Sequence, residues 1–470
     1  MGIDFLILLK QELVVSVLIF LLLMLKLGKD RSNEAILNLV NVLLLLNFAS
    51  GFFFGKEGAV FNGMFRSNAL VIFEKNILNF AFCIISMQSY AWLKTHKHVI
   101  EFYVLLLSAL LGMFFMLSTS NLLMFYLSLE LSTIPLAAAV NFDLSKKQSS
   151  EAAFKMIISS AFSSALLLLG ISFLYGISGS VDFAELAAKL IAGDALHLFA
   201  FILFLSGVAF KISAVPFHLW TADVYEGAPV AVTAYLSVVS KAAVLFVFVP
   251  VLYTVFKPLQ EAWYHMLFVL SLLTISTGNL FALRQNNVKR FLAFSSIAQV
   301  GFILVGISAG SREGMASVVY FVLVYVFSNL AAFGVISLIS AVMGRENIDG
   351  YKGLYKTNPM LTWVLTIALF SLAGVPPTAG FFGKFFLLFA GAARGNYWLI
   401  VIAALNMVIS FYYYLRLVKA MFMEESDTPV EKIAVPAWSR LSLYACVIGI
   451  IVAGLLGCIY DHVFSLSSGI

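Results

Sequence analysis

Apolar segments of about 20 residues follow one another along the chain, separated by short polar stretches. An α-helix needs that length to cross the hydrocarbon core of a bilayer. The pattern predicts an all-α polytopic membrane protein with about fourteen transmembrane helices, and an even number places both termini on one side. The predicted spans cover residues 12–28, 34–54, 69–93, 98–118, 120–140, 151–177, 194–220, 228–254, 262–283, 290–309, 314–343, 358–392, 396–422 and 437–461.

Basic residues are concentrated in the loops that follow the odd-numbered spans. Because loops rich in lysine and arginine remain in the cytoplasm, these loops are predicted to be cytoplasmic and both termini to face the outer side. The loop at Arg284–Arg290 is interpreted in the same way, as a determinant of topology. Ionisable residues near the ends of spans are expected to be interfacial anchors; they are Lys10, Glu12, Glu74, Lys75 and Glu101. The basic residues of the odd-numbered loops include Lys26, Lys29, Arg31, Lys94, Lys97, Lys146, Lys147, Arg284, Lys289, Arg290, Arg345, Lys352 and Lys356.

The composition excludes an ordinary soluble domain. Of the 470 residues, 62% are hydrophobic and 11% are charged, whereas a soluble domain carries roughly 25% charged residues. The three cysteines, Cys83, Cys446 and Cys458, lie in apolar segments and are expected to form neither a disulfide framework nor a metal site. The sequence has no glycine-rich nucleotide loop and no histidine pair with metal spacing, so any redox cofactors involved are expected to belong elsewhere. The formal charge of +5 identifies no partner, and no nucleic-acid partner is expected.

The most informative stretch runs from Val208 to Lys241 and places Lys211, Pro216 and His218 in otherwise apolar sequence. A charged side chain at mid-bilayer costs about 2.5–3.5 kcal/mol on insertion scales, so lysines at that depth indicate a function. Lys211 lies near the middle of its span, where a side chain cannot easily reach the interface. The alternative is a proline kink beside a lysine that extends to the membrane surface.

A second stretch, Leu372–Phe386, combines a Pro-Pro pair with Lys384. Proline removes one helix hydrogen bond and crowds the carbonyl four residues earlier, so both spans are predicted to be broken. The breaks should free the carbonyl groups of Ile212, Leu372 and Ala373. Freed carbonyls are tolerated at membrane depth where they line a cavity, so two broken spans with lysines favour a transporter with a repeated fold.

Glu130 is the only carboxylate in the fifth span and lies about midway along it. Lys211 is the predicted partner, because a nearby lysine would keep a buried carboxylate charged. Burial readily changes the proton affinity of a lysine, so a Glu–Lys pair that opens and closes would switch that affinity. The alternative is a static ion pair that only specifies helix packing.

Three further residues could extend this proton path. Lys241 lies near the middle of the eighth span and His218 follows the first predicted break, so both could continue a relay from Lys211. His218 is equally compatible with a hydrogen-bonded structural role. Lys155 lies about one turn into the sixth span, where extension to the interface competes with a functional role.

Several motifs resemble the antiporter-like membrane subunits of respiratory complex I, the NADH:quinone oxidoreductase. The resemblance covers most of the chain and rests first on PFHLWTADVYEGAP at Pro216–Pro229 and the AYLSVVSKAA that follows. Further matches are EAAFKMIISSAFSSALLLLGISFLYG at Glu151–Gly176, VKRFLAFSSIAQVGFILVG at Val288–Gly306 and LAGVPPTAGFFGKF at Leu372–Phe385. The Tyr-Glu-Gly sequence and the Ser-Lys pair favour the N-type branch of this family over its L- and M-type branches.

The resemblance implies a fold with two inverted five-helix repeats, each containing a broken helix. The repeats would cover residues 98–257 and 258–424. A three-helix segment at residues 1–97 would precede them, and a loop with the last helix at residues 425–470 would follow.

By motif position, the resemblance assigns proton translocation to Glu130, Lys211, Lys241 and Lys384, and a modulating role to Lys155. It implies no cofactor in this chain, because NADH, FMN, iron–sulfur clusters and quinone would belong to other subunits of the complex. The implied partners are neighbouring antiporter-like and small K-type membrane subunits, the lipid bilayer and protons. The implied location is a bacterial inner membrane.

The sequence also departs from the family pattern in three places. Ala222 stands where a proline is usual, Phe294 where a tyrosine is common and Gln299 where a histidine often occurs. The last two argue against a relay through the tenth span. Two other functions stay open: a subunit of a multisubunit cation/proton antiporter, and a scaffold whose ion pairs only hold helices together.

Overall fold

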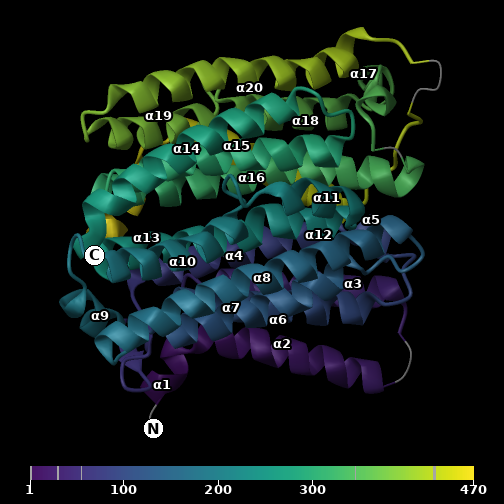
Figure 1. The fold of residues 1–470 in the computed structure, drawn as a ribbon. Coiled ribbons are helices and arrows are strands. Elements are labelled where there is room, and N and C mark those ends of the chain that lie inside the picture. Colours follow the sequence, from purple (N-terminus) through teal and green to yellow (C-terminus); the bar gives the residue numbers. More distant parts are fainter. Residues whose placement is uncertain (1–2, 29–30, 54, 345, 427–429, 470) are drawn as a thin grey trace.

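The computed structural model describes residues 3–28, 31–53, 55–344, 346–426 and 430–469. Its long helices lie side by side in one bundle (Figure 1), which confirms the predicted all-α membrane fold. Within these ranges, 12 helices are long and apolar enough to cross a membrane. The total of about fourteen spans stays a prediction. Lys29 and Arg345, two residues of the predicted basic loops, lie outside the described residues.

The helices of the first half of the chain follow the predicted spans. Side-chain caps fix several of their starts, since Asn68, Asn121 and Asp194 accept hydrogen bonds from backbone N–H groups two or three residues later. The helices are α1 (Ile3–Leu8), α2 (Lys10–Leu27), α3 (Asn33–Ser50), α4 (Ala69–Gln88), α5 (Tyr90–Leu93), α6 (Val99–Leu117), α7 (Leu122–Val140), α8 (Lys147–Ser178), α9 (Phe183–Lys189), α10 (Ala195–Ile212), α11 (Leu219–Gly227), α12 (Val230–Tyr235) and α13 (Lys241–Thr254).

The second half is helical in the same way. A π-helical turn at Leu236–Ser240 joins α12 and α13 into one span, which is almost entirely buried, and α15 is buried from Phe291 to its end. Polar side chains on these two spans therefore lie inside the protein. The remaining helices are α14 (Gln260–Ala282), α15 (Val288–Ser308), α16 (Arg312–Met343), α17 (Leu354–Thr357), α18 (Pro359–Ala373), α19 (Ala379–Ala392), α20 (Tyr397–Met423), α21 (Ala437–Leu455) and α22 (Cys458–Leu466).

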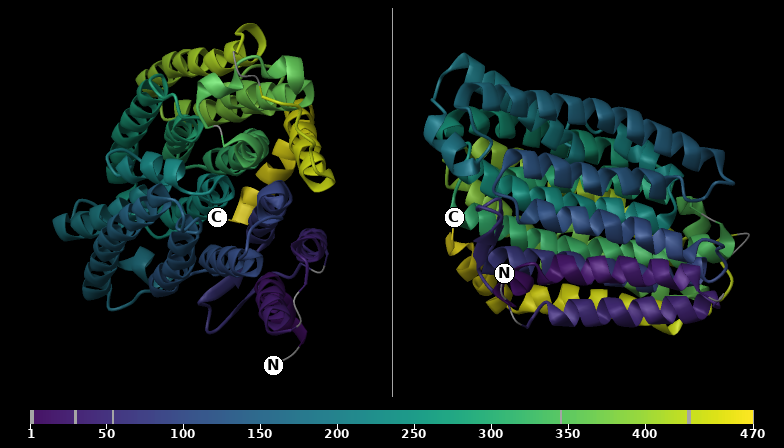
Figure 2. Two further views of the ribbon diagram at one scale, coloured as in Figure 1. Left: turned by 90° about the vertical axis from the view of Figure 1, so that its right-hand side faces the viewer. Right: turned by 90° about the horizontal axis from the view of Figure 1, so that it is seen from below.

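The two ends of the bundle differ. Both ends of the chain lie at one end of the bundle, together with α1 and α9 (Figures 1 and 2), and we call this the terminal end. The opposite end, which we call the basic end, carries the loops after α5, α7, α14 and α16. These loops include Lys97, Lys146 and Arg284. The side of the membrane that each end faces stays a prediction.

Both predicted breaks are present. Residues 213–218 separate α10 from α11, and residues 374–378 separate α18 from α19. The first residue of each gap has a positive φ angle, 64° at Ser213 and 85° at Gly374. A residue in this conformation ends an α-helix. One broken span starts at the terminal end and the other at the basic end (Figure 1), as an inverted arrangement requires. The two repeats and their boundaries stay a prediction.

One short segment departs from the all-helical expectation. The predicted span 34–54 ends early, because α3 stops at Ser50 before a glycine-rich tract of low helix propensity. The chain then forms an antiparallel hairpin of β1 (Gly58–Val60) and β2 (Phe65–Ser67). Phe65 is buried and bridges to Thr119, just after α6. The hairpin therefore closes the terminal end of the N-terminal helices.

A glycine at the second break permits a very close approach between α18 and α19. A Cβ at Gly380 would lie 1.7 Å from the Ser371 carbonyl oxygen, whereas a Cβ at Gly176 in α8 would meet nothing within 4 Å. We expect Gly380→Ala to lower the free energy of unfolding by about 1–3 kcal/mol through overpacking. Gly176→Ala should leave it unchanged or slightly raised. Thermal unfolding of the purified protein in detergent measures both, and equal melting temperatures would contradict the close approach.

Candidate functional site: a central polar axis

Ionisable and amide side chains predicted or found at the two breaks and on neighbouring helices lie on α7, α10, α13, α15 and α19. We call Glu130, Lys211, Lys241, Gln299 and Lys384 the central polar axis. Lys241 is 3% exposed, Gln299 is 1% exposed and Lys384 is fully buried, while Glu130 and Lys211 are partly buried. Buried charged groups need hydrogen-bond partners, so the partner of each residue determines what that residue can do.

Glu130 of α7 and Lys211 of α10 are linked indirectly. Lys211 Nζ donates to Thr133 Oγ1 at 2.7 Å, and Thr133 lies one turn after Glu130 on α7. The Glu130 carboxylate accepts a hydrogen bond from the Ser164 hydroxyl of α8. The structure shows no ion pair between Glu130 and Lys211, both of which it describes. The predicted direct contact is therefore absent, because Thr133 takes the hydrogen bond of the lysine.

Hydrogen bonds hold the break after α10 in place. The Val215 N–H donates to Thr274 Oγ1 of α14 at 3.0 Å, and Trp220 Nε1 donates to the Phe210 carbonyl at 3.2 Å. His218 lies in the gap, as predicted, and is 8% exposed. Its Nδ1 atom has no hydrogen-bond partner in the described part of the chain. This ring nitrogen is therefore available to a water or a proton at the break.

Helix α11 connects the break with Lys241. It begins just after His218 and carries Tyr225 near its other end, where the tyrosine ring centre lies 5.4 Å from Lys241 Nζ. Tyr225 is fully buried, and its hydroxyl lacks a partner among the residues described. The π-helical turn at Leu236–Ser240 immediately precedes Lys241. Such turns are rare and are frequent at functional sites, and the sequence analysis did not predict this one.

Lys241 is bound by a helix of the second half of the chain. Its Nζ donates to Ser296 Oγ of α15 at 2.8 Å. One turn earlier on the same span, Ser237 Oγ lies 2.9 Å from the Tyr325 hydroxyl of α16 and accepts a hydrogen bond from Asn329 Nδ2 at 2.7 Å. Both sets of partners are neutral. Lys241 is therefore the point at which the two halves of the axis meet.

The second break supplies the partners of Lys384. Lys384 Nζ donates to the carbonyls of Leu372 at 2.7 Å and Ala373 at 3.2 Å. These are the two carbonyls that the proline pair was predicted to free. Gln299 Nε2 donates to the same Leu372 carbonyl at 3.1 Å. Because Gln299 lies on α15, the tenth span joins Lys384 to the helix that binds Lys241, although the sequence departures argued against a relay there.

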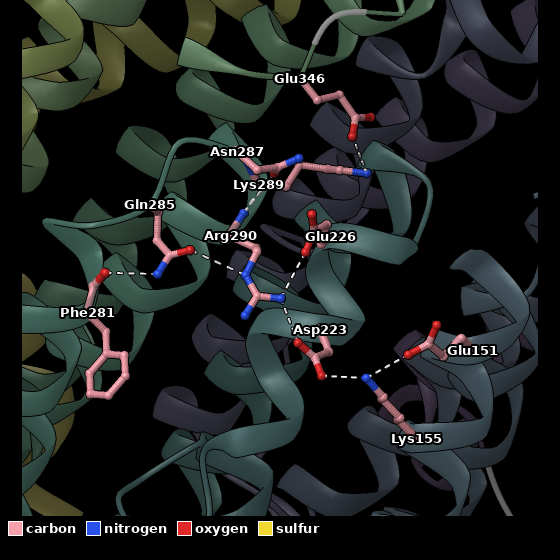
Figure 3. A network of polar contacts seen from close by, with 10 residues as sticks. All are labelled: Glu151, Lys155, Asp223, Glu226, Phe281, Gln285, Asn287, Lys289, Arg290 and Glu346. Atoms are coloured by element: carbon pink, nitrogen blue, oxygen red, sulfur yellow. Dashed lines mark hydrogen bonds and ion pairs between the residues drawn. The ribbon is translucent and has the colours of Figure 1, made fainter. Parts of the chain in front are cut away.

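Lys155 belongs to an ion-pair network at the basic end (Figure 3). Its Nζ lies 2.7 Å from Asp223 Oδ2 and 2.8 Å from Glu151 Oε1. Asp223 also binds Arg290 Nη1 of α15 at 2.6 Å, and Arg290 binds Glu226 of α11 at 2.8 Å. Partial burial would raise the pKa of Asp223, but the hydrogen bonds from Lys155 and Arg290 outweigh it and lower the pKa below its ordinary value. Asp223 is therefore ionised at neutral pH.

The position of Lys155 differs from the expected modulator of Glu130 and Lys211. Ser164, the partner of Glu130, lies about 13 Å further along α8. The contacts of Lys155 lead to α11 instead, the half-helix that follows the break after Lys211. The modulating role of Lys155 stays a prediction, and its contacts offer a route to Lys211 through α11.

Within the stretch Arg284–Arg290, the last two residues lie in the first turn of α15 and make contacts inside the protein in addition to any topogenic role. Lys289 is 4% exposed, pairs with Glu346 at 2.9 Å and donates to the Ala228 carbonyl at 3.1 Å. Lys289 and Arg290 thus fasten α11 and α12 to the second half of the chain. A cavity of about 400 Å³ lies beside these contacts at the start of α12, lined by Asp143, Lys146, Glu226, Lys289 and Glu346, among others.

The interfacial role expected for Glu12, Glu74 and Lys75 is wrong. Lys75 Nζ and Glu12 Oε1 form an ion pair of 2.5 Å, and the two residues are 1% and 2% exposed. Glu74 is also buried. The sequence did contain a signal of this burial, because Lys75 lies about 9 Å inside its helix and next to an acid. A second acid, Glu12, begins the first predicted span. Glu101 does lie at the surface, paired with Lys26 at 2.8 Å.

Fold and site together define a polytopic membrane protein of the transporter type, with ionisable residues at helix breaks. The chain belongs to the NADH:quinone oxidoreductase/Mrp antiporter transmembrane family, whose model matches residues 119–410. The NADH-quinone oxidoreductase subunit N of Azobacteroides pseudotrichonymphae is 48% identical over 423 residues, which cover 89% of this chain and 88% of the relative. The subunit N of Phocaeicola vulgatus is 47% identical over 411 residues, which cover 86% and 87%. These relatives confirm the resemblance inferred from the motifs.

Solved structures share the fold. A chain of respiratory complex I from Thermus thermophilus is 29% identical, with a TM-score of 0.84 over 96% of this chain and 98% of that chain. A chain of the Mrp complex from a Dietzia species is 19% identical, with a TM-score of 0.86 over 99% and 97%. The second likeness concerns the fold alone.

The ion-pair network predicts which substitutions interact with one at Lys155. We expect Lys155→Ala and Asp223→Asn to be non-additive by about 0.5–1 kcal/mol, because both remove the same partly exposed ion pair. Lys155→Ala and Glu130→Gln should be additive to within about 0.3 kcal/mol, because these residues do not touch. Thermal unfolding of the single and double variants measures both cycles. A stronger interaction with Glu130 than with Asp223 would restore a direct modulating role for Lys155.

Proposed function

We propose that this chain is a proton-translocating membrane subunit of a respiratory NADH:quinone oxidoreductase. The relatives at 48% and 47% identity, both named as subunit N of that enzyme, support the assignment. One observation carries the transport role. Lys211, Lys241 and Lys384 each donate from Nζ to a neutral oxygen, and none has an ion pair with a carboxylate in the described chain. A buried lysine without a fixed counter-ion can release and regain its proton.

The order of transfer follows the axis. Lys211 is loaded first, Lys241 receives the proton next and Lys384 passes it on toward the terminal end. The steps between the lysines are bridged by polar atoms that lack protein partners in the described residues, His218 Nδ1 in the first step and Gln299 Oε1 in the second. Protons enter from the basic end, where the cavity of about 400 Å³ opens beside α12.

Glu130 sets the proton affinity of Lys211 by its distance. In the structure Thr133, a neutral residue, is the partner of Lys211. A movement of α7 that replaces Thr133 with Glu130 as the partner of Lys211 would give the lysine a carboxylate partner. The lysine would then hold its proton more tightly. The two arrangements form an electrostatic switch, which the network around Lys155 and Asp223 biases through α11.

The finer assignments belong to the same proposal. The chain acts as a translocase without a redox centre of its own, and NADH, FMN, iron–sulfur clusters and quinone bind to other subunits. Its neighbours are antiporter-like and small K-type membrane subunits of the complex in a bacterial inner membrane. The basic end faces the cytoplasm and the terminal end faces outward, because loops rich in lysine and arginine stay inside.

A cation/proton antiporter subunit is the second candidate, because the chain shares its fold with a chain of the Mrp complex. Purification of the native complex separates the two functions. Flavin and iron–sulfur subunits in the same particle support the oxidoreductase, whereas sodium-driven proton exchange by a particle without them supports the antiporter.

Lys211→Ala tests the transport role. In membrane vesicles that contain the assembled complex, we expect proton uptake to fall on the order of 10²-fold, because the group that carries the proton is gone. Quinone reduction should fall with it, since the two are coupled, while the assembled amount stays normal. Lys257→Ala, which changes an exposed lysine at the terminal end, is the control and should match the wild type.

Two results would overturn the role of Lys211. Undiminished pumping by a normally assembled Lys211→Ala complex makes the lysine structural. If less complex assembles but the complex that remains has normal specific activity, the result favours the scaffold function, in which the charged residues only hold helices together.

Gln299 tests the step between Lys241 and Lys384. Gln299→Leu removes the amide that binds the Leu372 carbonyl and the Tyr414 hydroxyl. We expect proton uptake about tenfold lower, the equivalent of the ~1.4 kcal/mol of a lost buried hydrogen bond. Gln299→His keeps a polar group at this point and should retain most of the uptake. Proton uptake is measured per assembled complex in the same vesicles. If Gln299→Leu takes up protons as fast as Gln299→His, the tenth span is not part of the proton path.

A further inference from the structure

The N-terminal helices contain a second buried cluster of ionisable residues, outside the central polar axis. Lys75 of α4 pairs with Glu12 of α2 at 2.5 Å and donates to Ser118 Oγ, just after α6, at 2.7 Å. Glu74 is 2% exposed and directly precedes Lys75 on α4. The centre of the Phe65 ring lies 5.0 Å from Lys75 Nζ, so the β1–β2 hairpin covers the cluster at the terminal end.

The charges in this cluster do not balance. Two carboxylates and one ammonium group carry one net negative charge when Glu12, Glu74 and Lys75 are all ionised. A net charge is costly to bury without further partners. One bound proton makes the cluster neutral. The Lys75 ammonium group repels a metal cation, so a proton fits this site better than a metal ion.

Polar atoms without partners occur on the cluster and on residues that adjoin it in the sequence. Glu12 Oε2 and Glu74 Oε1 are buried and have no hydrogen-bond partner within the described ranges, and the same holds for Gln11 Nε2 and Asn76 Oδ1. All four residues are at most 5% exposed. An unmade buried hydrogen bond costs about 1–3 kcal/mol, and proteins meet that need with buried water where the site is polar. The cluster therefore fits water as well as a proton.

The polar surface continues from the cluster along α4. Asn79 lies one turn after Lys75, and its Oδ1 accepts a hydrogen bond from Asn47 Nδ2 of α3 at 2.7 Å. The remaining atoms of this pair, Asn47 Oδ1 and Asn79 Nδ2, again lack partners in the part of the chain described. Beyond Asn79 the buried ring of Phe82 occupies the same face of the helix. The unpartnered polar atoms thus run from Glu12 to Asn79.

We propose that the N-terminal helices hold a second, hydrated proton-binding site, centred on Glu12, Glu74 and Lys75. Its ligands are one exchangeable proton, carried by the Glu74 carboxyl group because Glu12 is paired with Lys75, and water that extends to the Asn47–Asn79 pair. The site is separate from the central polar axis, and it does not depend on the function proposed for Lys211, Lys241 and Lys384.

Infrared spectroscopy of the assembled membrane complex tests the site through the carbonyl-stretch band of a protonated carboxyl group. We expect Glu74→Gln to lack one such band that the wild type shows at neutral pH. In the wild type this band should shift when H2O is replaced by D2O, because water reaches the proton. Glu185→Gln, at an exposed glutamate of α9, is the matched control and should keep the band.

Each outcome decides the proposal. No loss of a band in Glu74→Gln means that the cluster holds no proton, and a lost band that is insensitive to D2O means that the site is closed to water. Either result overturns the proposal. If Glu74→Gln does not assemble, Glu74→Asp gives the same decision, because it moves the band instead of removing it. Proton pumping is not part of the readout, so failure of the transport proposal leaves this test unaffected.

Discussion

A charge inside an apolar bundle persists only where a hydrogen-bond partner meets it, and this constraint determines how the protein is built. A regular helix offers no free carbonyl to a lysine, because each carbonyl is already bonded within the helix. The breaks remove that limitation. Lys384 is bound by two carbonyls at the end of α18, and the Leu372 carbonyl is shared with Gln299. The second break therefore supplies the partners of Lys384, whereas Lys211 and Lys241 are bound by the hydroxyl groups of Thr133 and Ser296.

The charged groups divide into two kinds according to their partners. Along the axis the lysines bind neutral hydroxyls and carbonyls. At the basic end Lys155, Lys289 and Arg290 bind carboxylates directly and hold α8, α11, α12 and α15 together. A charge bound to a carboxylate is fixed in place, and breaking such a pair is costly when it is buried. The residues paired with carboxylates at the basic end therefore hold in register the helices on which the axis lysines depend.

Much of the fold could be predicted from local sequence, and much of the site could not. Helix spans and both breaks follow from apolar length and proline chemistry, which act within a few residues, and the freed carbonyls of Leu372 and Ala373 were predicted on that basis. The partner of Lys211 depends on how α7 is rotated against α10, and one turn decides between Thr133 and Glu130. The burial of Lys75 depends on a hairpin that covers the end of its helix. The depth of Lys75 in its helix was a local signal of burial, but its pairing with Glu12 and its cover by Phe65 depend on segments that are distant in the sequence.

Helix α15 has a mechanical consequence for the coupling of the two halves. It is a single uninterrupted rod that carries Arg290 at the basic end and Ser296 about 9 Å further along. Arg290 is clamped to α11, while Ser296 binds Lys241. The same helix therefore carries both the clamp on α11 and the hydroxyl partner of Lys241, so the position of a half-helix at the basic end and one buried hydrogen bond of the axis share a single support.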